Sequence, residues 1–186
     1  MQAIVFDFFG VICSEIAPFV LPRYMSPEAA IAYKANVVER ADLGEIDLPD
    51  VLDHLSHLTG ATPAQLEAEF WAFVKIDPAM VALIDNLHAR YKTALLSNAM
   101  RPFLGQILDK HDLLRRFDAM VISYEVGLTK PNPAIFQLTA QRLGVPASAC
   151  FFIDDSQINI DAARVVGMKA ARFTGVEQLK RDLAAL

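Results

Sequence analysis

Cysteine is scarce in this sequence of 186 residues, which holds two, Cys13 and Cys150. Two cysteines cannot form the dense disulfide framework that holds small secreted domains together. Each lies in an apolar run, so we predict buried, unreactive thiols. The four histidines show no metal-ligand spacing either, so nothing indicates a zinc site.

Long hydrophobic runs and an excess of basic charge are also missing. No apolar stretch approaches the roughly 18 residues that a membrane-spanning helix needs, and the first residues lack the basic segment of a secretory signal. Lysine and arginine number 17 against 22 acidic residues, which gives a net charge of −5 at pH 7. Nothing therefore attracts the chain to nucleic acid or to an anionic membrane, and we expect a cytoplasmic protein without such partners.

Apolar side chains, by contrast, are abundant, with 54% hydrophobic residues and 21% charged ones. This composition supports a sizeable core, and the length suits one domain, or one domain with an inserted subdomain. From about residue 77 onward, short apolar strands alternate with helices, which is typical of a parallel sheet covered on both faces. We therefore predict an α/β fold, a Rossmann-like parallel sheet flanked by helices.

The periodicity of apolar residues gives the expected elements. Strands are expected at 4–6, 92–96, 119–123, 149–153 and 169–173. Helices are expected at 79–90, before the second strand, and at 102–110, 134–143, 158–166 and 176–186, each after one of the last four strands. Between the first two strands the pattern is helical throughout, with helices expected at 27–40, at 48–58 and from about 62. We predict a core of residues 1–14 and 78–186, with a small helical subdomain, 15–77, inserted after the first strand.

Polar residues follow four of the expected strands. Asp7 ends the first, Ser97 and Asn98 end the second, a loop with Lys130 follows the third, and the pair 154–155 ends the fourth. The carboxyl ends of parallel strands meet at one edge, where ligands bind near a switch point. Taken singly, the aspartate could cap a helix, the serine and asparagine could begin one, and the lysine could be a solvated loop residue. Their convergence favours a functional site.

As a group these side chains suit the chemistry of a phosphate ester. Asp7 could attack phosphorus or carbon and form an ester that water later cleaves. Asp154 and Asp155 repel each other unless a cation or a lysine compensates, and Mg²⁺ is bound by such carboxylates together with substrate phosphate. The hydroxyl and N–H groups at 97–98 could hold phosphate oxygens, and Lys130 is placed to balance the acids.

Four segments, FDFFGV, LLSNA, GLTKPNPAIF and FFIDDSQINIDAA, resemble in order and spacing the four motifs of the haloacid dehalogenase-like hydrolase superfamily. The resemblance covers the whole chain, and residues 15–77 correspond to the small helical cap of that superfamily. The turn at Gly44, Glu45 and Ile46 is similar to the cap of the sugar-phosphate phosphatase branch. That branch includes the α-glucose-1-phosphate phosphatases and the epoxide hydrolase N-terminal domain.

The resemblance implies a Mg²⁺-dependent phosphatase that acts on a small phosphomonoester, such as a sugar phosphate, through an aspartyl-phosphate intermediate. It implies catalytic roles for Asp7, as the nucleophile, and for Lys130, which stabilises charge. The other roles that it implies are substrate binding by Gly10, Ser97, Asn98 and Lys130, metal binding by Asp7, the Phe9 carbonyl and Asp155, and support of the metal site by Asp154 and Asn159.

Phe9 departs from the family pattern, which usually has an aspartate here that protonates the leaving alkoxide and later deprotonates water. Loss of such acid–base help costs roughly 10²–10⁴-fold in rate. Three interpretations follow: a slow or restricted phosphatase, a metal-free 2-haloacid dehalogenase with a halide-binding arginine such as Arg23 or Arg40, or a catalytically silent phosphate-ligand binder. The run Asp154-Asp155-Ser156 with Asn159 resembles the metal-binding motif of phosphatases and favours the first.

Overall fold

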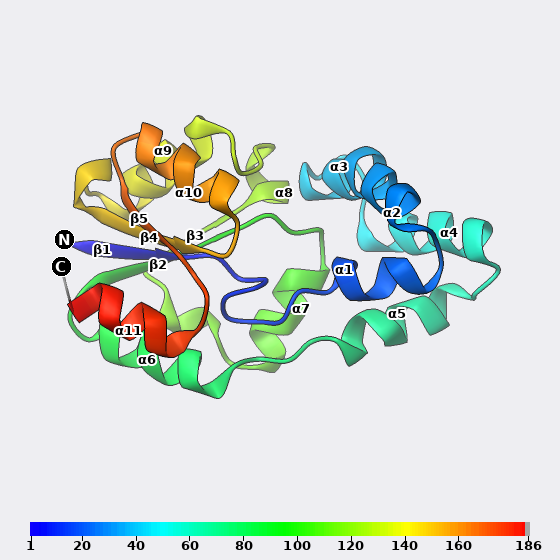
Figure 1. The fold of residues 1–186 in the computed structure, drawn as a ribbon, viewed down its shortest axis with the longest axis horizontal. Coiled ribbons are helices and arrows are strands. Elements are labelled where there is room, and N and C mark those ends of the chain that lie inside the picture. The colour runs from blue at the N-terminus through cyan, green and yellow to red at the C-terminus, as the bar shows by residue number, and fades with distance from the viewer. Residues whose placement is uncertain (185–186) are drawn as a thin grey trace.

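Five parallel strands form the centre of the structure, a computed structural model that describes residues 1–184 (Figure 1). The strands are β1 (Ala3–Phe6), β2 (Lys92–Ser97), β3 (Ala119–Ile122), β4 (Cys150–Asp154) and β5 (Lys169–Arg172). Their order across the sheet is β3-β2-β1-β4-β5, with every neighbouring pair parallel. The predicted α/β class and the approximate position of each strand are confirmed.

Helices cover both faces of this sheet (Figure 1). One face carries α9 (Pro133–Leu143) and α10 (Gln157–Val165), and the other carries α6 (Pro78–His88), α7 (Phe103–Lys110) and α11 (Val176–Ala184). The connections between strands include the short elements η3 (Leu114–Arg116), α8 (Ser123–Val126) and η4 (Ala147–Ala149). None of the helices in residues 1–184 is long and apolar enough to cross a bilayer.

The side chains of β1 alternate between two apolar cores. Ala3 and Val5 belong to a cluster with Phe136 and Phe152 under α9 and α10. Ile4 and Phe6 belong to a larger cluster on the opposite face, which continues into the helices that follow β1. All four side chains are fully buried, so β1 is apolar on both faces, as the central strand of a covered parallel sheet requires. Both cysteines are buried as well.

Residues between β1 and α6 form a helical insert beyond the carboxyl ends of the strands (Figure 1). Its elements are α1 (Ala17–Val20), η1 (Leu21–Arg23), α2 (Pro27–Tyr33), the π-helical turn η2 (Lys34–Val38), α3 (Glu39–Asp42), α4 (Leu48–Thr59) and α5 (Pro63–Ala72). Local sequence fixes its two longest helices, since Asp47 with Asp50 and Thr62 with Gln65 form capping boxes. The helical character expected for this region is confirmed.

Three local features differ from the sequence expectation. The helix expected over 27–40 runs to Asp42 and contains the π-helical turn. The sequence did not predict this turn, because one extra residue in a single turn does not disturb an apolar pattern that is read over several turns. The elements α1 and α8 are single turns, too short to show helical periodicity. The helix expected from about 62 ends at Ala72, so the apolar residues Phe73 and Val74 lie beyond it, and the last two residues of the expected helix 176–186 lie outside the described residues.

The loop between α3 and α4 holds the insert against the core. Gly44 has a φ of +78°, and a Cβ there would lie 2.5 Å from the carbonyl oxygen of Tyr124 in α8. Beside it, Arg101 Nε lies 3.1 Å from Asp47 Oδ1, and the Leu48 N–H donates to the Arg101 carbonyl at 2.8 Å. The backbone at Gly44 therefore packs directly against the backbone at Tyr124, and no flexible side chain lies between them that could move aside.

The substitution Gly44→Ala is expected to lower thermal stability more than Gly60→Ala does. Both glycines have similar positive φ, which costs an alanine roughly 1–2 kcal/mol, but a Cβ on Gly60 would meet open space. The difference between the two variants in thermal and denaturant unfolding isolates the collision with Tyr124. Equal losses would show that the close approach of the insert to α8 contributes nothing beyond backbone strain.

Candidate active site

A buried lysine joins two buried aspartates at the carboxyl edge of the sheet. Lys130 Nζ lies 2.6 Å from Asp7 Oδ1 and 2.7 Å from Asp154 Oδ2. The side chains of Lys130 and Asp154 are 2% and 0% exposed, and that of Asp7 is 10% exposed. Charges this deeply buried are stable only when they are paired, so the ammonium and the carboxylates depend on one another.

Strand register brings these three groups together. Phe6 of β1 pairs with Ile153 of β4, and the Asp7 N–H donates to the Ile153 carbonyl at 2.9 Å, so the residues that follow lie side by side. Lys130 comes from the loop between α8 and α9. Asn98, just after β2, fixes that loop, because its Oδ1 accepts from the Lys130 N–H at 2.8 Å and its Nδ2 donates to the Lys130 carbonyl at 2.9 Å.

Asp154 is fully engaged in hydrogen bonds. Its Oδ1 accepts from the Ser156 N–H at 2.8 Å and from Asn159 Nδ2 at 3.0 Å. Its Oδ2 accepts from Asn159 Nδ2 at 3.0 Å and from Lys130 Nζ at 2.7 Å. No lone pair is left for attack on a substrate, so Asp154 serves to orient Lys130 and Asn159.

Asp7 has one engaged and one available carboxylate oxygen. Its Oδ1 contacts Lys130 and accepts from the Phe8 N–H at 2.7 Å, whereas no donor of a described residue bonds to Oδ2. Burial raises the pKa of Asp7 well above its usual range, the charge of Lys130 opposes that rise, and Asp154 adds to it. The geometry leaves Oδ2 as the oxygen that can act on a ligand.

Asp155 supplies a third carboxylate. One oxygen each of Asp7, Asp154 and Asp155 lies within 4.8 Å of the others. Burial and the charge of Asp154 raise the pKa of Asp155, and the charges of Lys130 and Arg172 oppose that rise. A Cβ on Gly10, whose φ is +82°, would lie 2.7 Å from the Asp155 carboxylate, so only glycine leaves room for it.

These groups fit a hard divalent cation. Carboxylate oxygens of Asp7 and Asp155 are ligands that Mg²⁺ accepts, and the carbonyl oxygen of Phe9 receives no hydrogen bond from any described residue. Within residues 1–184, no other group of acids, histidines or cysteines has this spacing. The carboxylates of Asp7 and Asp155 therefore lie near one another, and metal binding by these two acids and the Phe9 carbonyl stays a prediction.

The remaining predicted site residues divide into two groups. Asn98, Lys130 and Asn159 line the cavity described below, with Asn98 tied to the lysine loop. Ser97 is fully buried, does not line the cavity, and donates its hydroxyl to the Asn98 carbonyl at 3.3 Å. Binding of a phosphoryl group by Ser97 and Asn98 stays a prediction.

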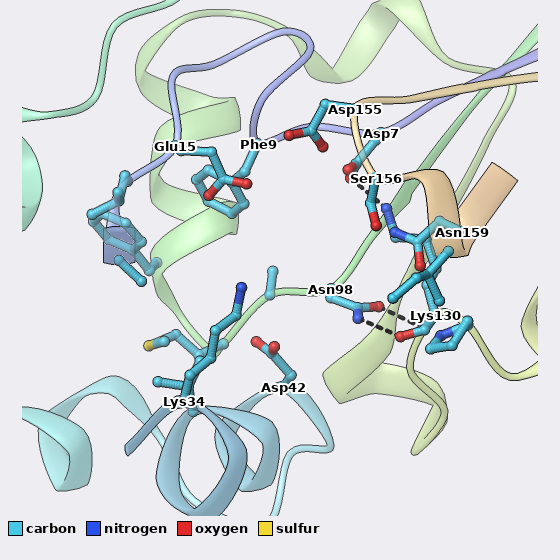
Figure 2. A pocket seen from close by; sticks show the side chains of 18 of the residues that line it. Asp7, Phe9, Glu15, Lys34, Asp42, Asn98, Lys130, Asp155, Ser156 and Asn159 are labelled. Carbon is cyan, nitrogen blue, oxygen red and sulfur yellow. Dashed lines mark hydrogen bonds and ion pairs between the residues drawn. The ribbon is translucent and has the colours of Figure 1, made fainter. Parts of the chain in front are cut away.

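A cavity of about 340 Å³ lies between this edge and the helical insert (Figure 2). Its polar lining from the sheet side is Asp7, Asn98, Lys130, Asp155, Ser156 and Asn159, and its apolar lining includes Phe9, Ile16, Val38, Phe70, Met100 and Phe103. Lys34 and Asp42 enter it from the insert, and Glu15 from the segment after β1. The space suits a small ligand.

Sequence reasoning missed Glu15, Lys34 and Asp42. The spacing of Lys34, Val38 and Asp42 at every fourth residue was the available signal, since it places all three on one side of a helical segment. That signal could not show which side faced the sheet. Arg23 and Arg40, the candidate halide ligands, pair with Glu69 at 2.9 Å and Glu45 at 3.0 Å on the surface, and neither lines the cavity.

Comparison with known proteins gives a match over most of the chain. Residues 1–167 match the sequence family described as haloacid dehalogenase-like hydrolase. The chain is 33% identical over 110 residues to mouse acyl-CoA dehydrogenase family member 10, a match that covers 59% of the chain and 10% of that protein. It is 33% identical over 91 residues to the fructose-1-phosphate phosphatase YqaB of Escherichia coli, covering 49% of the chain and 48% of YqaB. These matches thus span about half or less of the relatives' own length.

The chain is 26% identical over 196 residues to a phosphorylated carbohydrates phosphatase of Thermotoga maritima, a longer match that covers 100% of the chain and 90% of that protein. Among solved structures, the HAD family enzyme bt-2542 of Bacteroides thetaiotaomicron in its magnesium complex has a TM-score of 0.79 at 22% identity, with 98% of each chain covered. The L-2-haloacid dehalogenase of Xanthobacter autotrophicus has a TM-score of 0.69 at 21% identity, covering 100% of the chain and 83% of its own. Both likenesses concern the fold.

Replacement of Lys130 by methionine is expected to destabilise the chain by about 3–5 kcal/mol near neutral pH, because it leaves buried carboxylates without their ammonium. Without Lys130, the folded-state pKa of Asp7 rises further above its unfolded value. The loss should therefore be small at acid pH, where the carboxyl is protonated in both states, and should grow as pH rises through the folded-state pKa.

Chemical denaturation across pH in EDTA measures this effect, with Lys169→Met, at an exposed lysine, as the matched control. A loss for Lys130→Met that does not change with pH would contradict the assigned pairing.

Proposed function

The chain belongs to the haloacid dehalogenase-like hydrolases, and we propose that it is a Mg²⁺-dependent phosphatase of small phosphomonoesters. The observation that carries this proposal is the pairing at Asp7, where Lys130 holds one oxygen and leaves the other free beside two further carboxylates. An ester that enters the cavity meets this oxygen beside the Lys130 ammonium, and an anionic ester also needs a cation to offset the three carboxylates.

Each residue of the site then has a chemical role. Asp7 Oδ2 attacks phosphorus, the bond to the alcohol oxygen breaks, and the resulting aspartyl phosphate is cleaved by water. Lys130 balances the charge of the phosphoryl oxygens and of Asp154, and Asn98 keeps it in place. Asp154 and Asn159 hold this arrangement in turn through their mutual hydrogen bonds.

Asp7, the Phe9 carbonyl and Asp155 would hold the magnesium ion, which when bound neutralises charge on the phosphoryl group. The cluster of three carboxylates with one lysine supports this, because it carries more negative charge than the lysine balances. The magnesium complex of bt-2542, which has the same fold, gives the proposal further support.

A sugar phosphate is the substrate class that we propose. YqaB acts on fructose 1-phosphate and the Thermotoga protein on phosphorylated carbohydrates, as their names state. A cavity of about 340 Å³ suits a molecule of that size. In this proposal residues 15–77 act as a cap over the site of the core, residues 1–14 and 78–186, and the cap selects the substrate.

Phe9 restricts this function, because its ring has no proton for the leaving oxygen. A leaving group of low pKa needs none, and other substrates need a donor elsewhere in the cavity. The dehalogenase alternative has less support, since none of the residues that line the cavity is an arginine and three carboxylates meet there. A silent binder has the same site without turnover, so activity decides between them.

Hydrolysis of p-nitrophenyl phosphate tests the proposal directly, because p-nitrophenolate leaves without a proton. The purified chain is expected to release it with Mg²⁺, to lose that activity in EDTA, and to lose it in Asp7→Asn. Absence of turnover would favour the silent binder, and turnover that persists in Asp7→Asn would sink the nucleophile assignment. Metal-independent release of chloride from 2-chloropropionate would establish the dehalogenase instead.

A further inference from the structure

We propose that Asp42, on the helical insert, supplies the general acid–base chemistry that Phe9 cannot. This inference rests on the proposed phosphatase function and assigns a further catalytic residue to it. Asp42 ends α3 and lines the cavity. Figure 2 shows its carboxylate and the Lys34 ammonium directed into the cavity from the insert, across from Asp7 and Asp155.

The geometry of in-line attack on phosphorus places the leaving oxygen near the cavity wall that the insert forms. When Asp7 attacks phosphorus in line, the leaving oxygen lies on the side of phosphorus away from Asp7. That side faces the insert, where Lys34, Val38 and Asp42 line the cavity. Water that later cleaves the aspartyl phosphate must approach from the same side. One carboxyl on this wall is therefore placed to serve both half-reactions.

The backbone of the insert is shaped to present these side chains. Lys34 begins the π-helical turn η2, Val38 ends it, and Asp42 follows one turn later at the end of α3. Isolated π-helical turns occur frequently at functional sites, because they rotate the side chains that follow. The Gly44 loop directly after Asp42 is the one pressed against the Tyr124 carbonyl, which fixes the position of the acid relative to the core.

Asp42 is free to exchange a proton. None of the described residues forms a hydrogen bond or ion pair with its carboxylate, although burial in the cavity wall removes much of its hydration. Burial raises the pKa of Asp42 to about 7, the charges of Lys34 and Lys130 oppose the rise, and Glu39 and Glu15 add to it. Glu125, on the adjacent α8, is exposed to solvent. A pKa near the working pH suits a group that must both give and take a proton.

Glu15 is the other uncommitted carboxyl of the cavity. It lies on the side of Phe9 and Asp155 in Figure 2, away from Asp42. Burial raises the pKa of Glu15, and the charge of Asp155 adds to that rise. Its position beside the acidic cluster, rather than on the wall facing Asp7, makes it the weaker candidate. The variant Glu15→Gln therefore provides the competing arm of the experiment.

The proton balance closes without any other reactant. As Asp7 Oδ2 bonds to phosphorus, the electron pair of the breaking P–O bond goes to the alcohol oxygen, which takes the proton of the Asp42 carboxyl. The Asp42 carboxylate then takes a proton from water as the water oxygen bonds to phosphorus. The bond to Asp7 breaks, and inorganic phosphate and the Asp7 carboxylate are released.

The test compares an alkyl and an aryl ester in matched variants. Asp42→Asn should lower kcat/KM on fructose 1-phosphate and glycerol 1-phosphate roughly 10²–10⁴-fold, and on p-nitrophenyl phosphate less than about tenfold. Asp53→Asn makes the same change at an exposed acid of the insert and should alter neither. In the wild type, kcat/KM on the alkyl esters should fall above about pH 7, as Asp42 loses its proton, and this fall should be absent in Asp42→Asn.

A double variant separates proton donation from packing. Phe9→Asp combined with Asp42→Asn restores the usual donor at the position the family uses, and it should recover alkyl ester hydrolysis. Equal losses of Asp42→Asn on both esters, failure of this rescue, or transfer of the whole signature to Glu15→Gln would each overturn the assignment. Wild-type chain that cleaves the aryl ester and no alkyl ester would overturn it too. Each of these results leaves Mg²⁺- and Asp7-dependent hydrolysis of p-nitrophenyl phosphate intact, so the two proposals fail separately.

Discussion

The arrangement of the site depends on one buried ammonium group, that of Lys130. Lys130 can remain charged in the interior because Asp7 and Asp154 meet it at 2.6 and 2.7 Å, and those acids need it equally. The pairing depends on the register of β1 against β4 and on the loop that Asn98 holds in place. A buried cluster of this kind contributes little to the net free energy of folding. Its effect is to hold the charged groups in one arrangement.

The sheet and its polar edge could be predicted because local signals and topology agree. Short apolar strands between helices imply a parallel sheet, and a parallel sheet gathers Asp7, Asn98, Lys130 and Asp154 at one edge. Asp42 could not be predicted, because its place depends on how the insert docks on the core. Docking is decided by the Gly44 loop and by a π-helical turn, and neither alters the apolar pattern of the sequence.

Position 9 shows how backbone and side chain can carry separate functions. The carbonyl oxygen of Phe9 is available to a cation, as it would be with any residue at this position, while the ring adds apolar wall to the cavity. A phenylalanine in place of a side-chain acid therefore leaves this carbonyl oxygen in place and removes only the carboxyl group. In the proposed mechanism a proton donor must then come from another element, and the insert is the element on the side of the leaving group.

The two walls of the cavity come from stretches of chain that are separate in sequence. The strands and the loop of Lys130 build one wall, and the insert between β1 and α6 builds the other. Under the proposed function, an exchange of residues 15–77 by recombination would thus replace the wall that selects the substrate and Asp42 together, in a single event, and leave the charged edge untouched. Substrate choice and proton chemistry would be inherited as one unit, so a new insert could bring both at once to an old sheet.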